Sequence, residues 1–519
     1  MRQAAAGYTN RQRVARTHSI QAPVAGWNAR DSIANMRPGD AFRLRNIFPT
    51  QSDVMLRKGK AAHATGITGQ VETIASYRPP TGTHKMFSWA GTVVHDTTAA
   101  GAVGAAVVTG LTNARWQHTN FTTIGGNFLL AVNGADSVLS YDGAAWTSIT
   151  GVSTPAITGV TTSTLININV FKERVWYIQG ATLDVWYSAV GAFAGALTKF
   201  SLGSVFKRGG HLMAMGSWTI DGGTGLDDLA VFITSEGEVA VYQGTNPAFA
   251  ESWQLVGLFN IAAPIGRRCF AKFAGDLLIV TKDGVVPASK ALIASRTTSA
   301  IALTDRISGA MATAASLYSG TFGWELMQYG AGAMLLLNVP VAVGSQVQYV
   351  MNSTTGAWCE FTNWPANCFQ IHNDELYFGT NGAVQKAWTG TSDAGAYIVG
   401  DMVGAFDYFG DKNGLKHVTM LRPVIGWDAN PAEFLIGVDV DFIVQDPTGS
   451  VSFPAGGGSV WDTGTWDSAI WGGDISFNRD WYSVTGIGYA IAPHLKISSS
   501  QAGVRVSAFD FVYQKGGVL

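Results

Sequence analysis

The sequence predicts a mainly β fold, with a β-propeller of six or seven blades over residues 55–392. Three observations carry this prediction. Short strands alternate apolar and polar residues, tight Gly-containing turns separate them, and the strand–turn unit returns roughly every 40 to 60 residues, which is the spacing of propeller blades. A blade is a small sheet that buries its faces only against its neighbours, so a run of such units indicates a ring of blades. A stack of β-sandwiches is the competing architecture.

The repeated unit is best seen on either side of Glu236-Gly237, where AVFI (230–233) and VAVY (239–242) alternate and are rich in β-branched and aromatic residues. Because Asn, Asp and Gly tolerate positive φ, we expect hairpin turns at Asp142-Gly143, Glu236-Gly237, Asp283-Gly284 and Asn381-Gly382. The copies occupy 126–149, 169–189, 227–244, 271–289, 333–361 and 369–388, with a weaker copy at 72–98.

Three segments organise the chain. Residues 1–54 read as a basic, extended N-terminal arm and docking segment, and 393–519 as a C-terminal antiparallel β domain with strands at 432–445 and 504–514. Within the propeller, 304–319 predicts an inserted helix, because Thr304 can cap it and four apolar residues recur at helical spacing. These four residues are Ile307, Met311, Ala314 and Leu317.

The composition points to a protein covered by other subunits. Charged residues make up 13% of the chain, against about 25% in ordinary globular proteins. With 17 Trp and 26 Phe, little polar surface remains to face water, although large extracellular β proteins can also be charge-poor. We find no secretory signal and no apolar run of the ~18 residues that a spanning helix needs. The three cysteines form no CxxC, so we expect no disulfide scaffold. We expect the protein to be made and assembled in a reducing cytoplasm.

The N-terminus is the one strongly charged segment. Residues 1–30 contain no Asp or Glu, and the basic side chains there include Arg2, Arg11, Arg13 and Arg16. Such a segment is either a solvated arm or a contact for an acidic partner or nucleic acid.

Two acidic groups raise the question of a catalytic or metal site. Asp221, Asp227 and Asp228 surround a glycine cluster, but they lack the D-x-[DN]-x-[DN]-G spacing of a calcium loop, which favours a polar turn. Glu236 and Glu238 flank a turn, so we expect solvated hairpin residues and not the facing carboxyls of a glycosidase.

The aromatic cluster Trp461, Trp466 and Trp471 allows two interpretations. It could form a stacking platform for sugars or bases, or wedge a Gly-rich loop against a sheet or a neighbouring subunit. Five-residue spacing matches neither a helix nor a strand, which favours the second interpretation.

Motifs for catalysis are absent from the sequence. Arg267 and Arg268 could pair with an acid or a phosphate, yet two adjacent arginines are weak evidence. The sequence has no HExxH, no G-x-S-x-G and no phosphate-binding loop. We therefore expect no enzyme, no catalytic residue, no cofactor and no metal.

Several phrases, taken together and in order, resemble the β-propeller tail nozzle (tail tube or head-completion) proteins of short-tailed bacteriophages. They include APVAGWNARDSIANMRPGDAFRLRNIFPT (22–50), FSLGSVFKRGGHLMAMGSWTIDGGTGLDD (200–228), VFITSEGEVAVYQGTNP (231–247) and GDLLIVTKDGVVPASKAL (275–292). The resemblance covers residues 22–295 densely and continues more loosely to about 390.

The resemblance implies a structural virion protein of the phage tail, made in the host bacterial cytoplasm. It implies a homo-oligomeric, hexameric ring below the portal and adaptor proteins of the neck, in contact with other tail proteins. Such a ring would enclose the DNA exit channel and help to retain and release the genome. Double-stranded DNA should pass without tight binding, because each bound phosphate adds salt-dependent affinity.

Two other functions stay open at this point. One is a carbohydrate-binding propeller, either a receptor-binding tail part or a lectin, with Trp461, Trp466 and Trp471 as its platform. The other is a propeller glycosidase that uses acids between Asp221 and Glu238.

Overall fold

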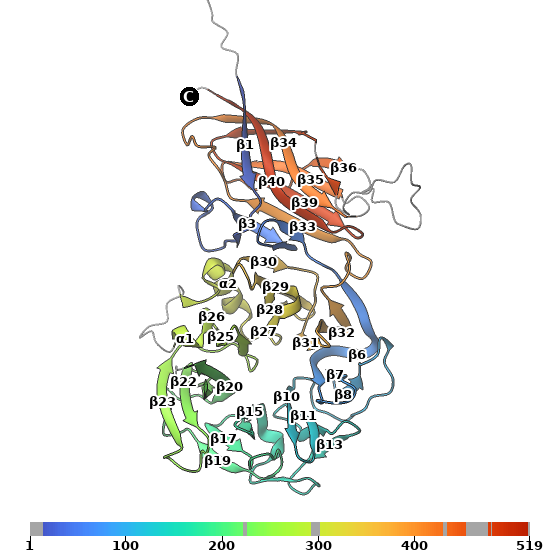
Figure 1. Cartoon of the computed structure of the whole chain (residues 1–519), viewed down its shortest axis with the longest axis vertical. Helices are drawn as coiled ribbons and strands as arrows, with labels where there is room; N and C mark the ends of the chain where they lie inside the picture. Colours follow the sequence, from blue (N-terminus) through green and yellow to red (C-terminus); the bar gives the residue numbers. More distant parts are fainter. Residues whose placement is uncertain are drawn as a thin grey trace, which may run out of the picture. The chain divides into compact units, whose positions relative to one another are not determined.

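The computed structural model describes residues 14–221, 226–291, 301–428, 433–452, 476–478 and 480–516. Strands account for 55% and helices for 6%, so the predicted mainly β class is confirmed (Figure 1). Contacts divide the chain into two units. The propeller unit comprises Lys58–Thr354 and Glu360–Ala394, and the terminal unit comprises Met1–Arg57, Thr355–Cys359 and Gly395–Leu519. The predicted segments 1–54 and 393–519 thus fall in the same unit.

The propeller unit is built from antiparallel sheets whose strands follow one another in the sequence. Three sheets have four strands each: β10 (Gln117–Thr123), β11 (Gly126–Val132), β12 (Val138–Tyr141) and β13 (Trp146–Ile149); β15 (Leu165–Phe171), β16 (Arg174–Gln179), β17 (Asp184–Tyr187) and β19 (Thr198–Ser201); and β20 (Leu212–Asp221), β21 (Leu226–Thr234), β22 (Glu238–Gly244) and β23 (Trp253–Asn260). A three-stranded sheet follows, with β24 (Phe270–Phe273), β25 (Asp276–Thr281) and β26 (Gly284–Pro287).

The remaining propeller strands close the ring. One sheet has the order β31-β32-β6-β7-β8, in which the ends of the unit meet. Its strands are β31 (Cys368–His372), β32 (Glu375–Ala387), β6 (Lys60–Tyr77), β7 (Lys85–Ala90) and β8 (Val93–Asp96), with β9 (Gly101–Ala102) at the side. The strands β27 (Glu325–Tyr329), β28 (Met334–Ala342) and β29 (Ser345–Asn352) form a further meander, and β14 (Ile157–Thr158) pairs with β18 (Gly195–Ala196).

The propeller has five blades, so the predicted six or seven is wrong. Strand β6 explains part of the difference. Its first half pairs with β32 and its second half pairs with β7, which joins two strand groups into one sheet. The β27–β29 meander likewise does not stand as a separate four-stranded sheet. The sequence shows each hairpin but not these hydrogen bonds between hairpins.

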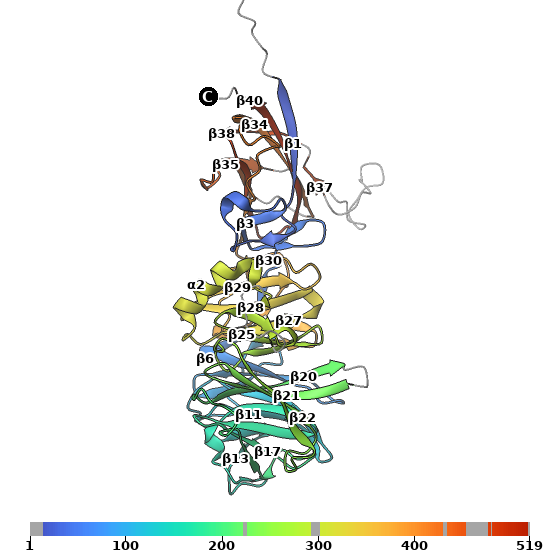
Figure 2. The ribbon, with the colours of Figure 1, turned by 90° about the vertical axis from the view of Figure 1, so that its left-hand side faces the viewer.

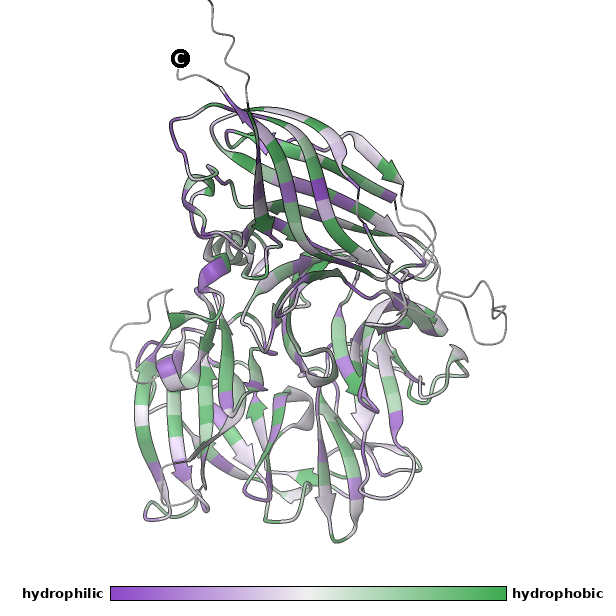
Figure 3. Cartoon of the chain, turned by 45° about the horizontal axis from the view of Figure 1, so that its top comes forward, coloured by the Kyte–Doolittle hydropathy of each residue, from purple (hydrophilic) through white to green (hydrophobic). Residues whose placement is uncertain are grey.

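Neighbouring blades share their cores, as expected for sheets that are too small to bury both faces alone. One cluster of buried side chains joins the β15–β19 sheet to the β20–β23 sheet. At its centre the ring of Trp253 stacks on Trp176 at 5.3 Å and on Tyr242 at 5.4 Å between centroids. Figure 3 shows hydrophobic residues along most propeller strands.

The predicted turns are found with one exception. Gly237 has φ +79°, and a Cβ there would lie 2.3 Å from the carbonyl oxygen of Ile261, so only glycine fits. Asn381-Gly382 is not a hairpin turn. It lies inside β32 at an irregularity in the pairing with β6, where Gly382 has φ +77°. The same backbone conformation that suits a turn also suits a β-bulge.

The predicted helix is present but shorter and differently seated. A 3-10 turn, Asp305–Ile307, leads into α2 (Ser308–Tyr318), after the short α1 (Ala288–Ala291). Thr304 makes no side-chain cap; its hydroxyl accepts a hydrogen bond from the Val285 N–H instead. The buried positions of α2 are Met311, Ala314 and Ala315, whereas Leu317, expected on that face, is 64% exposed.

The terminal unit carries the remaining strands. They are β1 (Ala15–Gln21), β2 (Gly26–Trp27), β3 (Asp40–Arg45), β4 (Ile47–Pro49), β5 (Val54–Leu56), β33 (Ile398–Gly404), β34 (Lys416–Trp427), β35 (Glu433–Val440), β36 (Gly449–Ser452), β37 (Ser476–Phe477), β38 (Tyr482–Gly488), β39 (Ile491–Ser499) and β40 (Val504–Lys515). The 3-10 turn Ile33–Asn35 lies between β2 and β3, and β30 (Trp358–Phe361) lies at the boundary of the units in sequence. Strands predicted at 432–445 and 504–514 correspond to β35 and β40.

The N-terminal segment is part of a sheet from Ala15 onward. Strand β1 pairs with β40 without interruption from Ala15 opposite Gln514 to Gln21 opposite Ala508, and Figures 1 and 2 both draw the two strands side by side. No helix in the described part of the chain is long and apolar enough to cross a membrane.

Candidate functional site: a cationic pocket at the centre of the propeller

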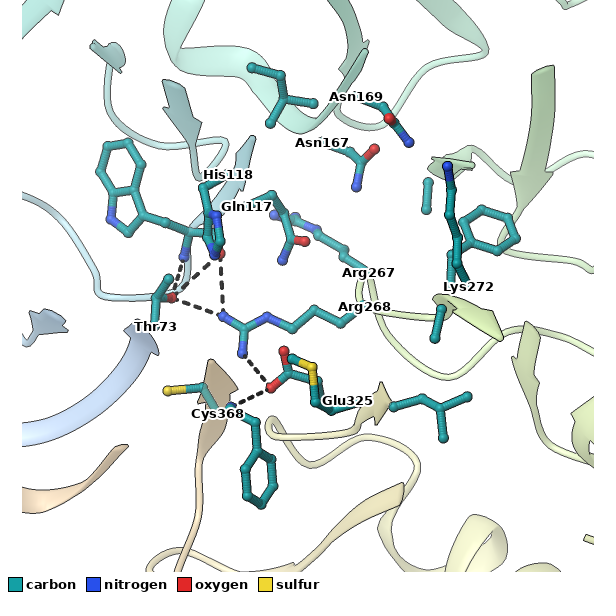
Figure 4. A pocket seen from close by; sticks show the side chains of 18 of the residues that line it. Thr73, Gln117, His118, Asn167, Asn169, Arg267, Arg268, Lys272, Glu325 and Cys368 are labelled. Carbon is teal, nitrogen blue, oxygen red and sulfur yellow. Dashed lines mark hydrogen bonds and ion pairs between the residues drawn. The ribbon is translucent and has the colours of Figure 1, made fainter. Parts of the chain in front are cut away.

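The blades surround a pocket of about 460 Å³ (Figure 4). Residues of β6, β10, β15, β20, β24, β27 and β31, and of the segments just before β10 and β24, line it. Its polar and charged lining includes Thr73, Gln117, His118, Asn167, Asn169, Arg267, Arg268, Lys272 and Glu325.

Arg268 connects the segment before β24 to β6, to the segment before β10 and to β27. Its Nη2 donates to the carbonyl oxygen of Glu72 at 2.9 Å, to Oγ1 of Thr73 at 2.9 Å and to the carbonyl oxygen of Trp116 at 3.3 Å. Its Nη1 lies 3.5 Å from Oε2 of Glu325. The side chain is 11% exposed, so most of its charge is held away from bulk water.

Glu325 is the carboxylate partner of Arg268. It lies on β27, its side chain is 14% exposed, and its Oε2 also accepts a hydrogen bond from the Phe369 N–H at 2.9 Å. Burial raises the pKa of Glu325, while the Arg268 charge and the Phe369 N–H oppose that rise. Because the Glu325 carboxylate and the Arg268 guanidinium bind each other, the pair holds their strands together and neither group serves as a free acid or base.

Arg267 and Lys272 are less engaged than Arg268. Nη1 of Arg267 donates to the carbonyl oxygen of Asn133 at 3.1 Å. Neither side chain forms a salt bridge with a described residue, and both are exposed to the pocket. A guanidinium has five N–H donors, so most donors of Arg267 remain available.

Burial also controls the two other titratable groups of the lining. It lowers the pKa of His118 to about 4, with a further contribution from the Arg268 charge, so His118 is neutral near pH 7. Burial raises the pKa of the Cys368 thiol to about 12, so this cysteine is not a nucleophile. The lining therefore offers cations and neutral donors but no nucleophile beside a base.

Amide side chains complete the lining. Oδ1 of Asn167, a residue that is 6% exposed, accepts from the Met215 N–H, and Nδ2 of Asn169 donates to the Met215 carbonyl oxygen. These bonds link β15 to β20. Within the described residues, Nδ2 of Asn167 has no hydrogen-bond acceptor. A second pocket of about 480 Å³ shares Gln117, Arg267 and Arg268 with the first.

Of the residues expected from the sequence as contact sites, the structure describes only Arg16. Arg2, Arg11 and Arg13 lie outside the described residues, as do Trp461, Trp466 and Trp471. Arg16 lies on β1, opposite Tyr513, and is exposed. Arg267 and Arg268, noted in the sequence as weak evidence, do line the pocket, but Glu325 and Thr73 were missed. No motif signals them, because they come together only when the ring closes.

The acidic stretch forms a β-hairpin. Strands β20 and β21 pair through Asp221 opposite Leu226, and Asp228 lies on β21. Oδ2 of Asp228 accepts from the Lys172 ammonium at 2.7 Å and Oδ1 from the Thr219 hydroxyl, and the Lys172 contact lowers its pKa. The described part of the chain contains no group of three or more His, Cys, Asp or Glu residues placed to hold a metal.

Glu238 corrects the expectation of two solvated acids. Glu236 is exposed, but Glu238 is only 2% exposed. Its Oε2 accepts from the backbone N–H groups of Lys207 at 3.0 Å and Arg208 at 2.8 Å. A solvated carboxylate would bind water instead of backbone N–H groups. Glu238 therefore holds the loop that precedes β20 in place.

Comparison with known proteins finds only distant structural similarity. No protein-family model matches the sequence, and no curated protein matches it. Many solved structures match. The BBS1N chain crystallised in complex with ARL6DN has a TM-score of 0.38 at 8% identity, covering 64% of this chain and 96% of that one. Raptor of Chaetomium thermophilum has a TM-score of 0.38 at 10% identity, covering 64% and 29%. YCF48 bound to D1 peptide has a TM-score of 0.35 at 11% identity, covering 66% and 96%.

Proposed function

We propose that this chain is a structural virion protein of a short-tailed bacteriophage, one subunit of a tail nozzle ring that encloses the DNA exit channel. The observation that carries the proposal is the ordered resemblance of residues 22–295 to that family. The pocket's lack of a nucleophile–base pair and the low charge content support a passive part over an enzyme. A hexameric ring in contact with portal or adaptor proteins follows from the same resemblance.

The small central pocket supports a channel between subunits and not through one propeller. Its volume is about 460 Å³, and the ion-paired Arg268 and Glu325 are both part of its lining. Duplex DNA, whose major groove alone is about 12 Å wide, is far too large for such a space. In the proposal, therefore, copies of the chain surround the DNA together.

Strand β23 provides a candidate surface for contact between copies. It is the last strand of its sheet, so one edge carries no further strand among the described residues. Leu255 and Val256 on β23 are 44% and 52% exposed, and Phe249 just before it is 63% exposed. Neighbouring exposed apolar side chains at a strand edge are typical of a protein interface.

Electron microscopy of the purified full-length protein, with sedimentation velocity, tests this proposal. We expect closed rings, and we expect Leu255→Ser with Val256→Ser to shift the population toward monomers. Val152→Ser, at a position 95% exposed elsewhere on the propeller, is the matched control and should leave rings intact. If rings persist in the double variant, β23 is not part of the interface between copies. A monomer at every concentration that binds defined sugars on a glycan array would favour the carbohydrate-binding alternative.

A further inference from the structure

The geometry points to a binding site for a small oxyanion, a phosphate or a carboxylate, in the central pocket of the propeller. The inference concerns a single folded chain and does not depend on ring formation. The lining places three cations, Arg267, Arg268 and Lys272, against one carboxylate, Glu325. The lining itself therefore carries two more positive charges than negative ones.

Arg267 and Lys272 are the lining cations that form no salt bridge with a described residue, although the Lys272 charge also acts on Asp228 of β21. The Arg268 charge is balanced by Glu325 at 3.5 Å and its donors are used by three oxygen atoms of β6 and the segment before β10. Arg267 gives one hydrogen bond to the Asn133 carbonyl, and Lys272 forms no ion pair with any described residue. Figure 4 shows both side chains among those that line the pocket. An ionised oxygen offers such donors charge-assisted hydrogen bonds, which are stronger than neutral ones.

Neutral donors complete the binding chemistry. Asn167 is 6% exposed, its Oδ1 is occupied by the Met215 N–H, and its Nδ2 has no acceptor among the described residues. This fixes which end of the amide is available, since Oδ1 must accept. The Asn167 amide and the two cations therefore present several N–H donors to the pocket. An oxyanion supplies several acceptors and negative charge in one small group.

The size of the pocket sets an upper limit on the size of the ligand. A phosphate ion or a short carboxylate fits a volume of about 460 Å³, whereas duplex DNA does not. The Arg268 charge also helps to keep His118 neutral, in agreement with a positive potential in the pocket. Free phosphate and a carboxylate share this chemistry, so the experiment includes each of them.

Isothermal titration of the full-length protein with sodium phosphate and with sodium succinate tests the site, against sodium chloride at the same ionic strength. We expect one site per chain for at least one of the two oxyanions, and the stronger of them identifies the preferred group. Arg267→Gln and Lys272→Gln should each weaken binding about tenfold, since a charge-assisted bond of this kind corresponds to about one decade in affinity. Arg208→Gln and Lys282→Gln, at exposed positions of the same unit, should leave binding unchanged.

Three outcomes would overturn the inference. Heats that match those of chloride would show that no oxyanion site exists. Equal affinity in Arg267→Gln, Lys272→Gln and the two controls would place binding elsewhere on the surface. Competition by a short DNA duplex with the same dependence on Arg267 would show a phosphate-binding surface that accepts nucleic acid and not a site for small oxyanions. Because Lys272 carries no structural hydrogen bond among the described residues, Lys272→Gln remains informative even if Arg267→Gln fails to fold.

Discussion

Replacing Arg268 by methionine should destabilise the propeller unit strongly. The guanidinium contacts four oxygen atoms that belong to Glu72, Thr73, Trp116 and Glu325, between 2.9 and 3.5 Å away. Methionine fills a similar volume but donates no hydrogen bond. The change therefore removes the ties between blades and leaves the Glu325 carboxylate, 14% exposed, without its cation.

The expected cost follows from the carboxylate that is left behind. Removing one partner of a buried ion pair costs about 3 to 5 kcal/mol. Pocket water can solvate the three released oxygens and part of Glu325, so we expect the lower end, about 3 kcal/mol. Arg268→Met with Glu325→Gln should cost less than the sum of the single changes, by about 2 kcal/mol, because contacting residues couple by this order.

The cost should also depend on pH. Burial raises the pKa of Glu325 and Arg268 opposes this rise, so the variant without Arg268 has a folded-state pKa further above the unfolded value of 4.5. A carboxyl with a raised folded-state pKa binds a proton more readily when folded, so stability improves as pH falls through that pKa. The free-energy gap between wild type and Arg268→Met should thus narrow from about pH 8 to about pH 5.

Urea unfolding followed by tryptophan fluorescence measures these free energies. Arg208→Met, an exposed arginine without a salt bridge to described residues, is the control and should stay within about 0.5 kcal/mol of wild type. The reasoning fails if Arg268→Met costs under about 1 kcal/mol, if the single changes add within about 0.5 kcal/mol, or if the gap is the same at both pH values.

Two further predictions concern the terminal unit. Burial would lower the pKa of His494, but hydrogen bonds and charges from Asp401 and Asp439 raise it instead. The protonated His494 therefore stabilises the fold fully below the unfolded pKa of 6.5, and this stabilisation is lost as pH rises through the folded pKa. His494→Asn should consequently destabilise more at about pH 6 than at about pH 9 in thermal melts, and equal effects would contradict the assignment. Deleting residues 1–13 should leave the fold intact, since β1 begins at Ala15. Under the proposed function, the deletion should weaken co-sedimentation with the portal or adaptor proteins, and unchanged attachment would contradict a docking role of the arm.

Alternation and turn chemistry allowed most strands to be predicted, because both act within a few residues. The hairpins around Glu236-Gly237 and Asp283-Gly284 are present as expected. The predicted number of blades was wrong because the pairing of β6 with both β32 and β7 depends on contacts between segments far apart in the sequence. The prediction that Leu317 is buried was wrong, because helical spacing predicts a common face but does not show where the neighbouring strands end.

The candidate site was only half accessible to sequence reasoning. Arg267 and Arg268 stood out as a basic pair, yet their meaning depends on partners that are 57 to 196 residues away. Glu238 was misjudged for the same reason, since the N–H groups that it accepts from lie 30 and 31 residues upstream. Local patterns reveal which side chains can carry charge, but only the closed ring determines which charges are paired.

The position of the cations bears on the proposed passage of DNA. Each phosphate that a protein neutralises adds salt-dependent affinity, so cations that face a DNA channel would slow the exit of the genome. In this chain the Arg268 charge is paired with Glu325, and Arg267 and Lys272 line a pocket of about 460 Å³. A duplex that passes outside the propeller would not enter a pocket of this volume. Under the proposed function, the central pocket and the DNA channel are therefore separate, and an oxyanion could stabilise each subunit without retarding the DNA.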